Sequence, residues 1–292
     1  MSARLRAAAA ETESIVAAGR YRAPDGREVS VAAAVEAARA GTRMFGPAPV
    51  PVGPPAAGRG TVLAPVVEVT GESSLEAARR LAGPAEVAVL NFASARNPGG
   101  GYLNGAQAQE EALCRASALH TCLLTARAFY DHHRAERDPF YTDRVIHSPA
   151  VPVFRDDRGD LLARPYLAGF LTSAAPNAGV VRRTVPQRAA ELPGVLARRA
   201  ERVLETAAAQ GYRNLVLGAW GCGVFQNDPA QVANAFRGPL GPGGRFAHSF
   251  EHVVFGVLDR TAGTVVRAAF ERAFDQGVSG RRADGTVPQV QP

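Results

Sequence analysis

Lysine is absent from this 292-residue sequence, and cysteine, methionine and tryptophan are scarce, with three, two and one residues. Without lysine, the chain cannot build the phosphate-binding loop that ends in Gly-Lys-Ser or Gly-Lys-Thr. Cys114, Cys122 and Cys222 form no C-x-x-C pair, so neither a disulfide framework nor a zinc ribbon is predicted. No run of about 18 apolar residues occurs. We therefore expect a cytoplasmic protein without a membrane span.

The basic residues are all arginine, and the formal net charge is +6. The arginines are scattered along the chain and form no block with interleaved aromatic residues, so specific binding of nucleic acid is not predicted. We interpret the bias as that of an arginine- and alanine-rich genome. A positive charge still raises the local concentration of any anionic polymer, which permits such a substrate.

The first part of the chain, residues 1–60, is predicted to be an N-terminal helical extension. Alanine-rich segments at 2–19 and 30–41 have helical character, and a short hairpin is expected over 21–30 between them. Residues 46–60 are rich in proline and glycine, which is typical of an extended connector. We place a domain boundary at residue 60.

Beyond residue 60, short apolar runs alternate with helical stretches up to about residue 278. One long helix is expected from about 105 to 134, and two short strands joined by an Asp-Gly-type turn over 144–162. This alternation predicts an α/β fold with three layers, α/β/α, around a mixed central sheet. Residues 279–292 are expected to form a disordered tail.

Two glycine-rich loops follow buried-looking strands and precede helices. The first glycine loop is "NFASARNPGGGYLNG", residues 91–105, and the second glycine loop is "GAWGCGVFQND", residues 218–228. Glycine amides can curve around phosphate oxygens, and helix N-termini favour anions. A flexible loop is the alternative for either segment alone. Because both loops share this context, we favour a diphosphate ligand.

The sequence Gln109-Glu110-Glu111 begins the predicted helix after the first glycine loop. Acidic residues in a first turn can simply stabilise the helix dipole. Adjacent helical residues point about 100° apart, so the two carboxylates cannot face each other across a scissile bond. They suggest a division of labour, in which one orients hydroxyl groups and the other donates a proton. The donor would need a pKa raised by burial and by its neighbour.

Other candidates for chemistry are weaker. Cys222 has no histidine near it in sequence, so a small residue in a tight turn is favoured over a nucleophile. The Phe225 ring could belong to the core or could press against a sugar. No metal site is predicted, because three histidines of the central region lack acids or cysteines at matching spacing: His120, His132 and His133.

The stretch "GGGYLNGAQAQEE" resembles the poly(ADP-ribose) glycohydrolase family, in which three glycines precede Gln-Glu-Glu; here the spacer is residues 102–108. The second glycine loop looks like the diphosphate-binding loop of the macrodomain fold. "VIHSPAVPVFRDD" and "TSAAPN" are similar to segments of the family's bacterial-type branch. The resemblance spans roughly 61–274 and implies a macrodomain-like catalytic domain over residues 61–278.

The resemblance also implies roles for particular residues. Glu111 would protonate the leaving oxygen of the ribose–ribose O-glycosidic bond and then activate water, and Phe225 would force the distal ribose toward it. Glu110 and Asn97 would hold the terminal ribose. The remaining expected substrate-binding residues are Gln109 of the motif and those that enclose the diphosphate: Gly99, Gly100, Gly101, Gly221, Cys222, Gly223 and Val224.

The implied activity is exo-acting hydrolysis of poly(ADP-ribose) to ADP-ribose, with no cofactor and no metal. Expected partners are the polymer, ADP-ribose and poly(ADP-ribosyl)ated proteins. Two alternatives stay open: a non-catalytic reader of ADP-ribose, and a hydrolase of mono-ADP-ribosyl proteins. The sequence assigns no role to the N-terminal helices.

Overall fold

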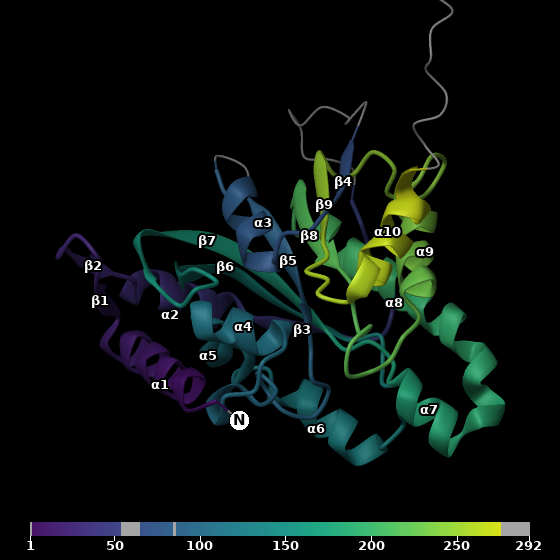
Figure 1. The fold of residues 1–292 in the computed structure, drawn as a ribbon, viewed down its shortest axis with the longest axis horizontal. Helices are drawn as coiled ribbons and strands as arrows, with labels where there is room; N and C mark the ends of the chain where they lie inside the picture. Colours follow the sequence, from purple (N-terminus) through teal and green to yellow (C-terminus); the bar gives the residue numbers. More distant parts are fainter. Residues whose placement is uncertain (1, 54–64, 84–85, 276–292) are drawn as a thin grey trace, which may run out of the picture.

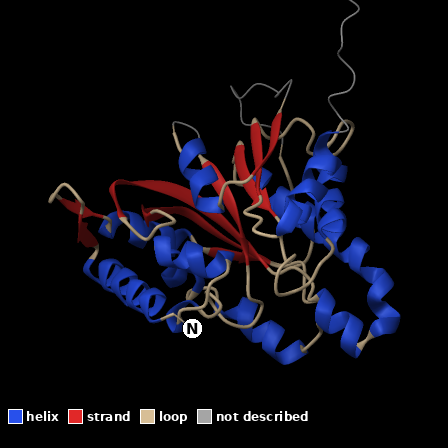
Figure 2. Cartoon of the chain, viewed as in Figure 1, coloured by secondary structure: helices blue, strands red, loops and turns tan. Residues whose placement is uncertain are grey.

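A computed structural model of the chain describes residues 2–53, 65–83 and 86–275. It has a central seven-stranded sheet with helices on both faces (Figures 1 and 2), which confirms the predicted α/β class and mixed sheet. The strands are β1 (Arg20–Arg22), β2 (Glu28–Ser30), β3 (Arg43–Phe45), β4 (Val66–Thr70), β5 (Val87–Phe92), β6 (Val145–Arg155), β7 (Leu161–Ser173), β8 (Asn214–Gly218) and β9 (His252–Gly256). The α-helices are α1 (Ala3–Ala18), α2 (Ala32–Gly41), α3 (Ser74–Leu81), α4 (Gln109–Ala116), α5 (Leu119–Leu123), α6 (Arg127–Glu136), α7 (Ala178–Thr184), α8 (Leu192–Ala209), α9 (Pro229–Leu240) and α10 (Val265–Asp275). Short 3-10 helices are η1 (Tyr102–Asn104), η2 (Pro186–Glu191) and η3 (Ala262–Thr264).

The strand order across the sheet is β3-β6-β7-β5-β8-β9-β4. The five strands from β7 to β4 run parallel to one another, while β6 is antiparallel to both β7 and β3. Parallel strands must be covered on both faces, and β5 shows this directly. Val87 and Val89 belong to the core beneath α1–α6, whereas Ala88 and Leu90 belong to the core beneath α8–α10.

The N-terminal segment packs against this sheet. The predicted hairpin is present as β1 and β2, with Tyr21 opposite Val29. Strand β3 pairs with β6, so a segment that precedes residue 60 extends the central sheet. The division of the chain at residue 60 stays a prediction. The predicted tail, 279–292, and part of the predicted connector lie outside the described residues.

The expectation of one long helix over 105–134 was wrong, because three helices, α4, α5 and α6, occupy this segment. Helix α4 ends where Ser117 adopts an extended backbone, with φ −147° and ψ 176°. Ser117 forms a bridge with Val153 of β6. Its hydroxyl donates to the Leu113 carbonyl and accepts from the Leu119 N–H, so serine replaces the helical hydrogen bonds locally.

The hairpin over β6 and β7 is also longer than predicted. The expected turn is present, since Asp156 accepts hydrogen bonds from the Arg158 and Asp160 N–H groups and Gly159 has φ +94°. The short strand expected directly after it and the following expected strand are one continuous strand, β7. The pairing register shifts at an irregularity between Ser148 and Val151 of β6 and again between Val153 and Arg155.

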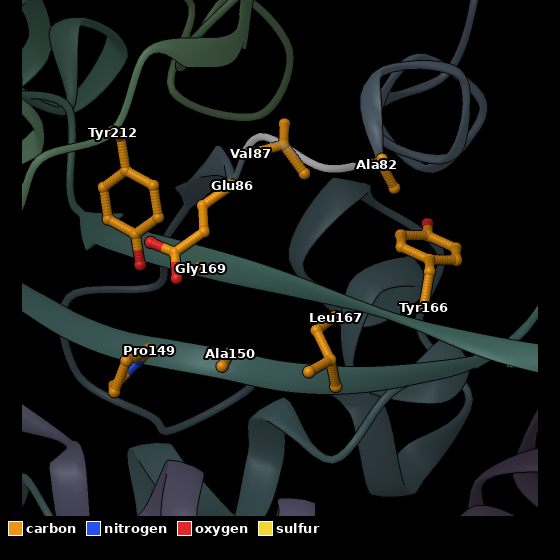
Figure 3. Close-up of a pocket in the computed structure, with 10 residues that line it drawn as sticks. Ala82, Glu86, Val87, Pro149, Ala150, Tyr166, Leu167, Gly169 and Tyr212 are labelled. Carbon is orange, nitrogen blue, oxygen red and sulfur yellow. The ribbon is translucent and has the colours of Figure 1, made fainter. Parts of the chain in front are cut away.

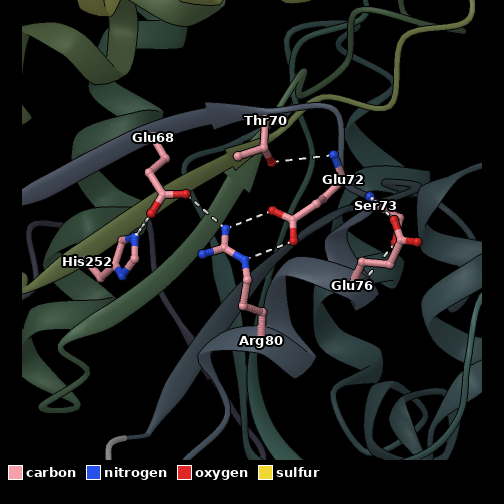
Figure 4. Close-up of polar contacts among 7 residues, drawn as sticks. All are labelled: Glu68, Thr70, Glu72, Ser73, Glu76, Arg80 and His252. Carbon is pink, nitrogen blue, oxygen red and sulfur yellow. Dashed lines mark hydrogen bonds and ion pairs between the residues drawn. The ribbon is translucent and has the colours of Figure 1, made fainter.

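An ion-pair network joins helix α3 to strand β4 (Figure 4). The Arg80 guanidinium lies 3.0 Å from the Glu68 carboxylate of β4 and 2.7 Å from that of Glu72. His252 of β9 contacts Glu68 from the other side. The helix begins at a capping box on Ser73, as its sequence predicts. None of the helices within the described residues has the length and apolar character that a membrane span requires.

Candidate active site

The two glycine loops leave neighbouring parallel strands at the same edge of the sheet. The first follows β5 and the second follows β8, and these strands are paired. At their ends, a Cβ placed on Gly218 would lie 3.1 Å from the Phe92 ring. A Cβ on Gly221 would lie 2.6 Å from the Ala175 Cβ, just beyond β7. The loops therefore lie at the carboxyl edge of the sheet, where ligands bind in open α/β folds.

The glycines of the first loop lie directly against the carboxylates of α4. Gly99 and Gly100 have φ values of +69° and +59°, a region that favours glycine. A Cβ on Gly100 would lie 2.4 Å from Glu111 Oε1 and 3.1 Å from Glu110 Oε2. The backbone N–H of Gly101 donates to Glu111 Oε1 at 2.9 Å. The absence of side chains here lets the loop pack flat over both acids.

Two backbone amides fix the Glu111 side chain. Besides the Gly101 amide, the N–H of Ala108 donates to Glu111 Oε2 at 3.0 Å. Glu111 thus both caps the first turn of α4 and supports the glycine loop. The residue is 8% exposed, and each of its two carboxylate oxygens has a backbone donor.

Glu110 is more deeply buried, at 3% exposure. Its carboxyl accepts hydrogen bonds from the Ser94 N–H at 2.7 Å and from Asn91 Nδ2 at 3.3 Å. Burial raises the pKa of Glu110 to about 8; the two hydrogen bonds oppose this shift, and the charge of Glu111 adds to it. The raised pKa that is expected for a carboxyl of this motif is found at Glu110, the more deeply buried of the two glutamates.

Gln109 and Asn97 occupy different environments. The Gln109 amide is bound to β5, accepting from the Phe92 N–H at 2.9 Å and donating to the Leu90 carbonyl at 2.8 Å. Asn97 is exposed at the start of the glycine triplet, and its carbonyl accepts from the Gly100 N–H. Contact of either side chain with substrate stays a prediction, while Gln109 also ties α4 to the strand end.

The second glycine loop is tightly folded at its start. Gly221 has φ +71°, and a Cβ there would lie 2.5 Å from Asn227 Nδ2. Burial raises the pKa of the Cys222 thiol to about 12, which favours a small turn residue over a nucleophile. Gly223 and Val224 are exposed, Val224 by 82%. Binding of a diphosphate by this loop stays a prediction.

Phe225 ends the exposed part of the second glycine loop. Its ring is partly buried, and its centroid lies 5.9 Å from that of Tyr141, which in turn lies 5.6 Å from His133. The Phe225 carbonyl accepts from the Gly179 N–H at 3.0 Å. The ring is therefore packed against Tyr141 and partly exposed. This is compatible with both expected roles, packing in the core and contact with a sugar.

Sequence reasoning missed several residues that shape the site. Asn91 could have been predicted, because it is a fully buried amide in an otherwise apolar strand, and a buried amide needs polar partners. Ser94 contributes its backbone N–H to the Glu110 carboxyl, and Tyr141 contributes a ring contact to Phe225. The local sequence predicts neither contact.

The histidines of the central region have separate surroundings. His133 is buried beside Thr142, and burial lowers its pKa to about 4. His120 is buried near Glu13, and His132 is partly exposed on α6. Within the described ranges, no three His, Cys, Asp or Glu side chains are grouped as ligands of a metal ion would be.

A separate pocket of about 410 Å³ lies near the amino end of β5, on the opposite edge of the sheet (Figure 3). Tyr212, Tyr166 and Glu86 line it, with the Glu86 carboxyl on the Tyr212 side. The Tyr212 hydroxyl is bound to His147 and the Tyr166 hydroxyl donates to the Leu75 carbonyl. This pocket is distinct from the candidate active site, because it lies at the other edge of the sheet and both tyrosine hydroxyls are already hydrogen bonded within the protein.

The fold and the paired glycine loops define a macrodomain-like protein with a carboxyl pair at its ligand edge. The family described as the catalytic domain of microbial-type PARG matches residues 9–156. Poly(ADP-ribose) glycohydrolase from Thermomonospora curvata, solved with the inhibitor ADP-HPD, is 48% identical over 94% of this chain and 100% of that chain, with a TM-score of 0.84. The enzyme from Deinococcus radiodurans, solved with ADP-ribose, is 44% identical over 83% and 97%, with a TM-score of 0.75. A search of curated proteins found no match. The chain belongs to the microbial-type poly(ADP-ribose) glycohydrolase family.

Proposed function

We propose that the protein hydrolyses ribose–ribose O-glycosidic bonds of poly(ADP-ribose) and releases ADP-ribose from chain ends. The observation that carries this proposal is the packing of Gly100 against the carboxyls of Glu110 and Glu111 at the edge where both glycine loops meet. A protein that only binds ADP-ribose needs the loops but has no need of this buried acid pair. Membership of the family supports the same activity.

Glu111 is the proposed general acid and base. The amides of Gly101 and Ala108 hold its carboxylate in one orientation, which is what proton transfer to a leaving oxygen requires. Protonation of the leaving ribose oxygen breaks the glycosidic bond, and the resulting carboxylate then takes a proton from the attacking water. Glu110 is neutral at neutral pH, so it can orient ribose hydroxyls without adding a charge beside the diphosphate.

The substrate diphosphate is proposed to lie between residues 99–101 and residues 221–224. Both segments present backbone at the same sheet edge, and neither has side chains that would block close approach, except for Val224. The developing oxocarbenium ion would then lie next to the diphosphate of the substrate, so a second protein carboxylate is not required on the far side of the sugar. Phe225 at the rim would press the distal ribose toward Glu111.

The direct test is incubation of the purified chain with poly(ADP-ribose), followed by measurement of free ADP-ribose. The decisive variant is Glu111→Gln, which should lower turnover by about 10²- to 10⁴-fold, as expected for loss of a general acid. ADP-ribose should bind to the variant about as well as to the parent, because the loops are unchanged.

Glu28→Gln provides a matched control. Glu28 lies on β2, is exposed and pairs with Arg20 of β1 at 3.6 Å, so its replacement removes a surface carboxylate that belongs to neither glycine loop. It should keep full turnover. Substantial turnover by Glu111→Gln would contradict the assigned role, and binding without turnover by the parent would favour the ADP-ribose reader. Release of ADP-ribose only from singly modified protein would favour the mono-ADP-ribosyl hydrolase.

We also propose that the polymer is presented on poly(ADP-ribosyl)ated proteins and that the enzyme works in the cytoplasm. The three cysteines are free thiols, which fits a reducing compartment. Fractionation of the source cells and immunodetection of the protein tests its location. Recovery outside the cytoplasmic fraction would contradict this part of the proposal.

A further inference from the structure

Helix α1 lies against η1, the short helix that follows the glycine triplet. Tyr102, the first residue of η1, is 1% exposed. Its hydroxyl lies within donor distance of two acceptors on α1, 3.0 Å from Glu13 Oε1 and 3.1 Å from the Ala9 carbonyl. A residue near the N-terminus thus binds the end of the first glycine loop across 89 positions of sequence.

The same carboxylate oxygen also binds His120 of α5. Nδ1 of His120 lies 3.1 Å from Glu13 Oε1, and the His120 ring centroid lies 5.0 Å from that of Tyr102. The His120 ring and the Cβ of Tyr102 lie against Gly99 of the glycine triplet. A Cβ on Gly99 would lie 3.0 Å from His120 Cδ2 and 3.6 Å from the Tyr102 Cβ.

The contacts continue from these rings to the proposed proton donor. The Tyr102 N–H donates to the Gly99 carbonyl at 3.0 Å, and the adjacent Gly101 N–H donates to Glu111 Oε1. Glycine backbone has little conformational preference of its own. The position of the triplet is therefore set by what packs against it, and on this side His120, Cys114 and Tyr102 provide that packing.

Glu13 is suited to hold both rings. Burial alone would raise its pKa, but the hydrogen bonds from His120 and Tyr102 and the charge of His120 lower the pKa below its usual value. The carboxylate is therefore ionised at neutral pH, and its hydrogen bonds are of the stronger, charge-assisted kind. Its side chain is 38% exposed to a cleft between α1 and α2, so replacing it opens no cavity in the core.

We propose that Glu13 is a positioning residue for catalysis. It fixes Tyr102 and His120 beneath residues 99–101 and thereby sets the Gly101 amide that orients Glu111. This gives the N-terminal helix a function in turnover. The inference rests on the proposed function, because its effect is read through hydrolysis at Glu111.

The test compares Glu13→Ala, Glu13→Gln and Glu11→Ala. Glu11 lies on the same helix but pairs with Arg155, 2.7 Å away. Glu11→Ala leaves the buried Arg155 guanidinium without its carboxylate, so it should lower the unfolding temperature at least as much as Glu13→Ala while leaving turnover within about twofold of the parent. Glu13→Ala should lower kcat by about tenfold or more, because small displacements of a catalytic group are costly.

Glu13→Gln should restore most of the turnover, because an amide oxygen can accept from both Tyr102 and His120. Tyr102→Phe keeps the ring and removes one hydrogen bond, so it should lower kcat by about two- to tenfold even if Glu13→Ala does not fold. Equal kcat for Glu13→Ala and Glu11→Ala, or no difference between Tyr102→Phe and the parent, would overturn the proposal.

The two proposals fail in distinguishable ways. An inactive parent would contradict the proposed function. ADP-ribose binding then still reports on the loop, and Glu13→Ala should bind it more weakly than Glu11→Ala. Equal binding by those two variants would overturn the positioning role as well. An active parent with an unaffected Glu13→Ala variant would overturn the positioning role alone.

Discussion

The Gly100→Ala substitution tests most directly whether the glycine triplet holds the carboxyl pair. Gly100 has φ +59°, and its added methyl group would lie 2.4 Å from Glu111 Oε1 and 3.1 Å from Glu110 Oε2. Ordinary contact begins near 3.4 Å, so either the Glu111 carboxylate or the loop must move by about 1 Å. The two carboxylate oxygens nearest to the added methyl group belong to Glu111 and Glu110, the residues of the proposed catalytic pair.

Two separate costs follow from this geometry. A residue with a Cβ in the left-handed region is strained by about 1–2 kcal/mol. Displacement of Glu111 also weakens its hydrogen bond from Gly101, which adds about 1 kcal/mol. The free energy of unfolding should therefore fall by about 2–3 kcal/mol. A displacement of about 1 Å at the proton donor should lower kcat by about 100-fold.

Gly26→Ala separates strain from displacement. Gly26 has φ +83°, and a Cβ there would have nothing within 4 Å, so this variant has the backbone strain without a clash. It should lose about 1–2 kcal/mol of stability and keep its turnover. The measurements are thermal unfolding and initial rates of ADP-ribose release at saturating polymer. If Gly100→Ala were as active as Gly26→Ala, the packing of the triplet against Glu111 would have no catalytic importance.

Two further predictions concern Glu110 and Phe225. The folded-state pKa of Glu110, about 8, lies above its ordinary value of 4.5, so the folded protein retains a proton that the unfolded chain releases, and stability falls as pH rises through this window. The Glu110→Gln variant stays neutral at this position. The difference between its unfolding free energy and that of the parent should therefore rise from pH 4.5 to pH 8 by at most about 4–5 kcal/mol and then level off. A constant difference across this pH range, measured by chemical denaturation, would refute the assignment. Phe225→Ala should lower kcat by about tenfold or more but cost only about 1–2 kcal/mol of stability, because the ring is partly buried. An unfolded Phe225→Ala variant would instead place the ring in the core.

The local sequence was sufficient for much of the fold and for the location of the site. Alternation of apolar runs and helical stretches predicted the α/β class, and the turn residues predicted the β1–β2 hairpin. The glycine triplet and the Gln-Glu-Glu sequence identified the family before any coordinates, because both signals lie within residues 99–111. These features depend on interactions between near neighbours, which a sequence pattern records directly.

Only the tertiary structure determined how deeply each of the two glutamates is buried and which distant residues support them. The two glutamates are adjacent in sequence, and only their packing under the glycine loop shows that Glu110 is the more buried and has the raised pKa. The break at Ser117 depends on a bridge to β6, and the contact between Glu13 and Tyr102 joins distant segments. Burial and long-range contacts depend on how the whole chain packs, and a local pattern of residues contains no record of that packing.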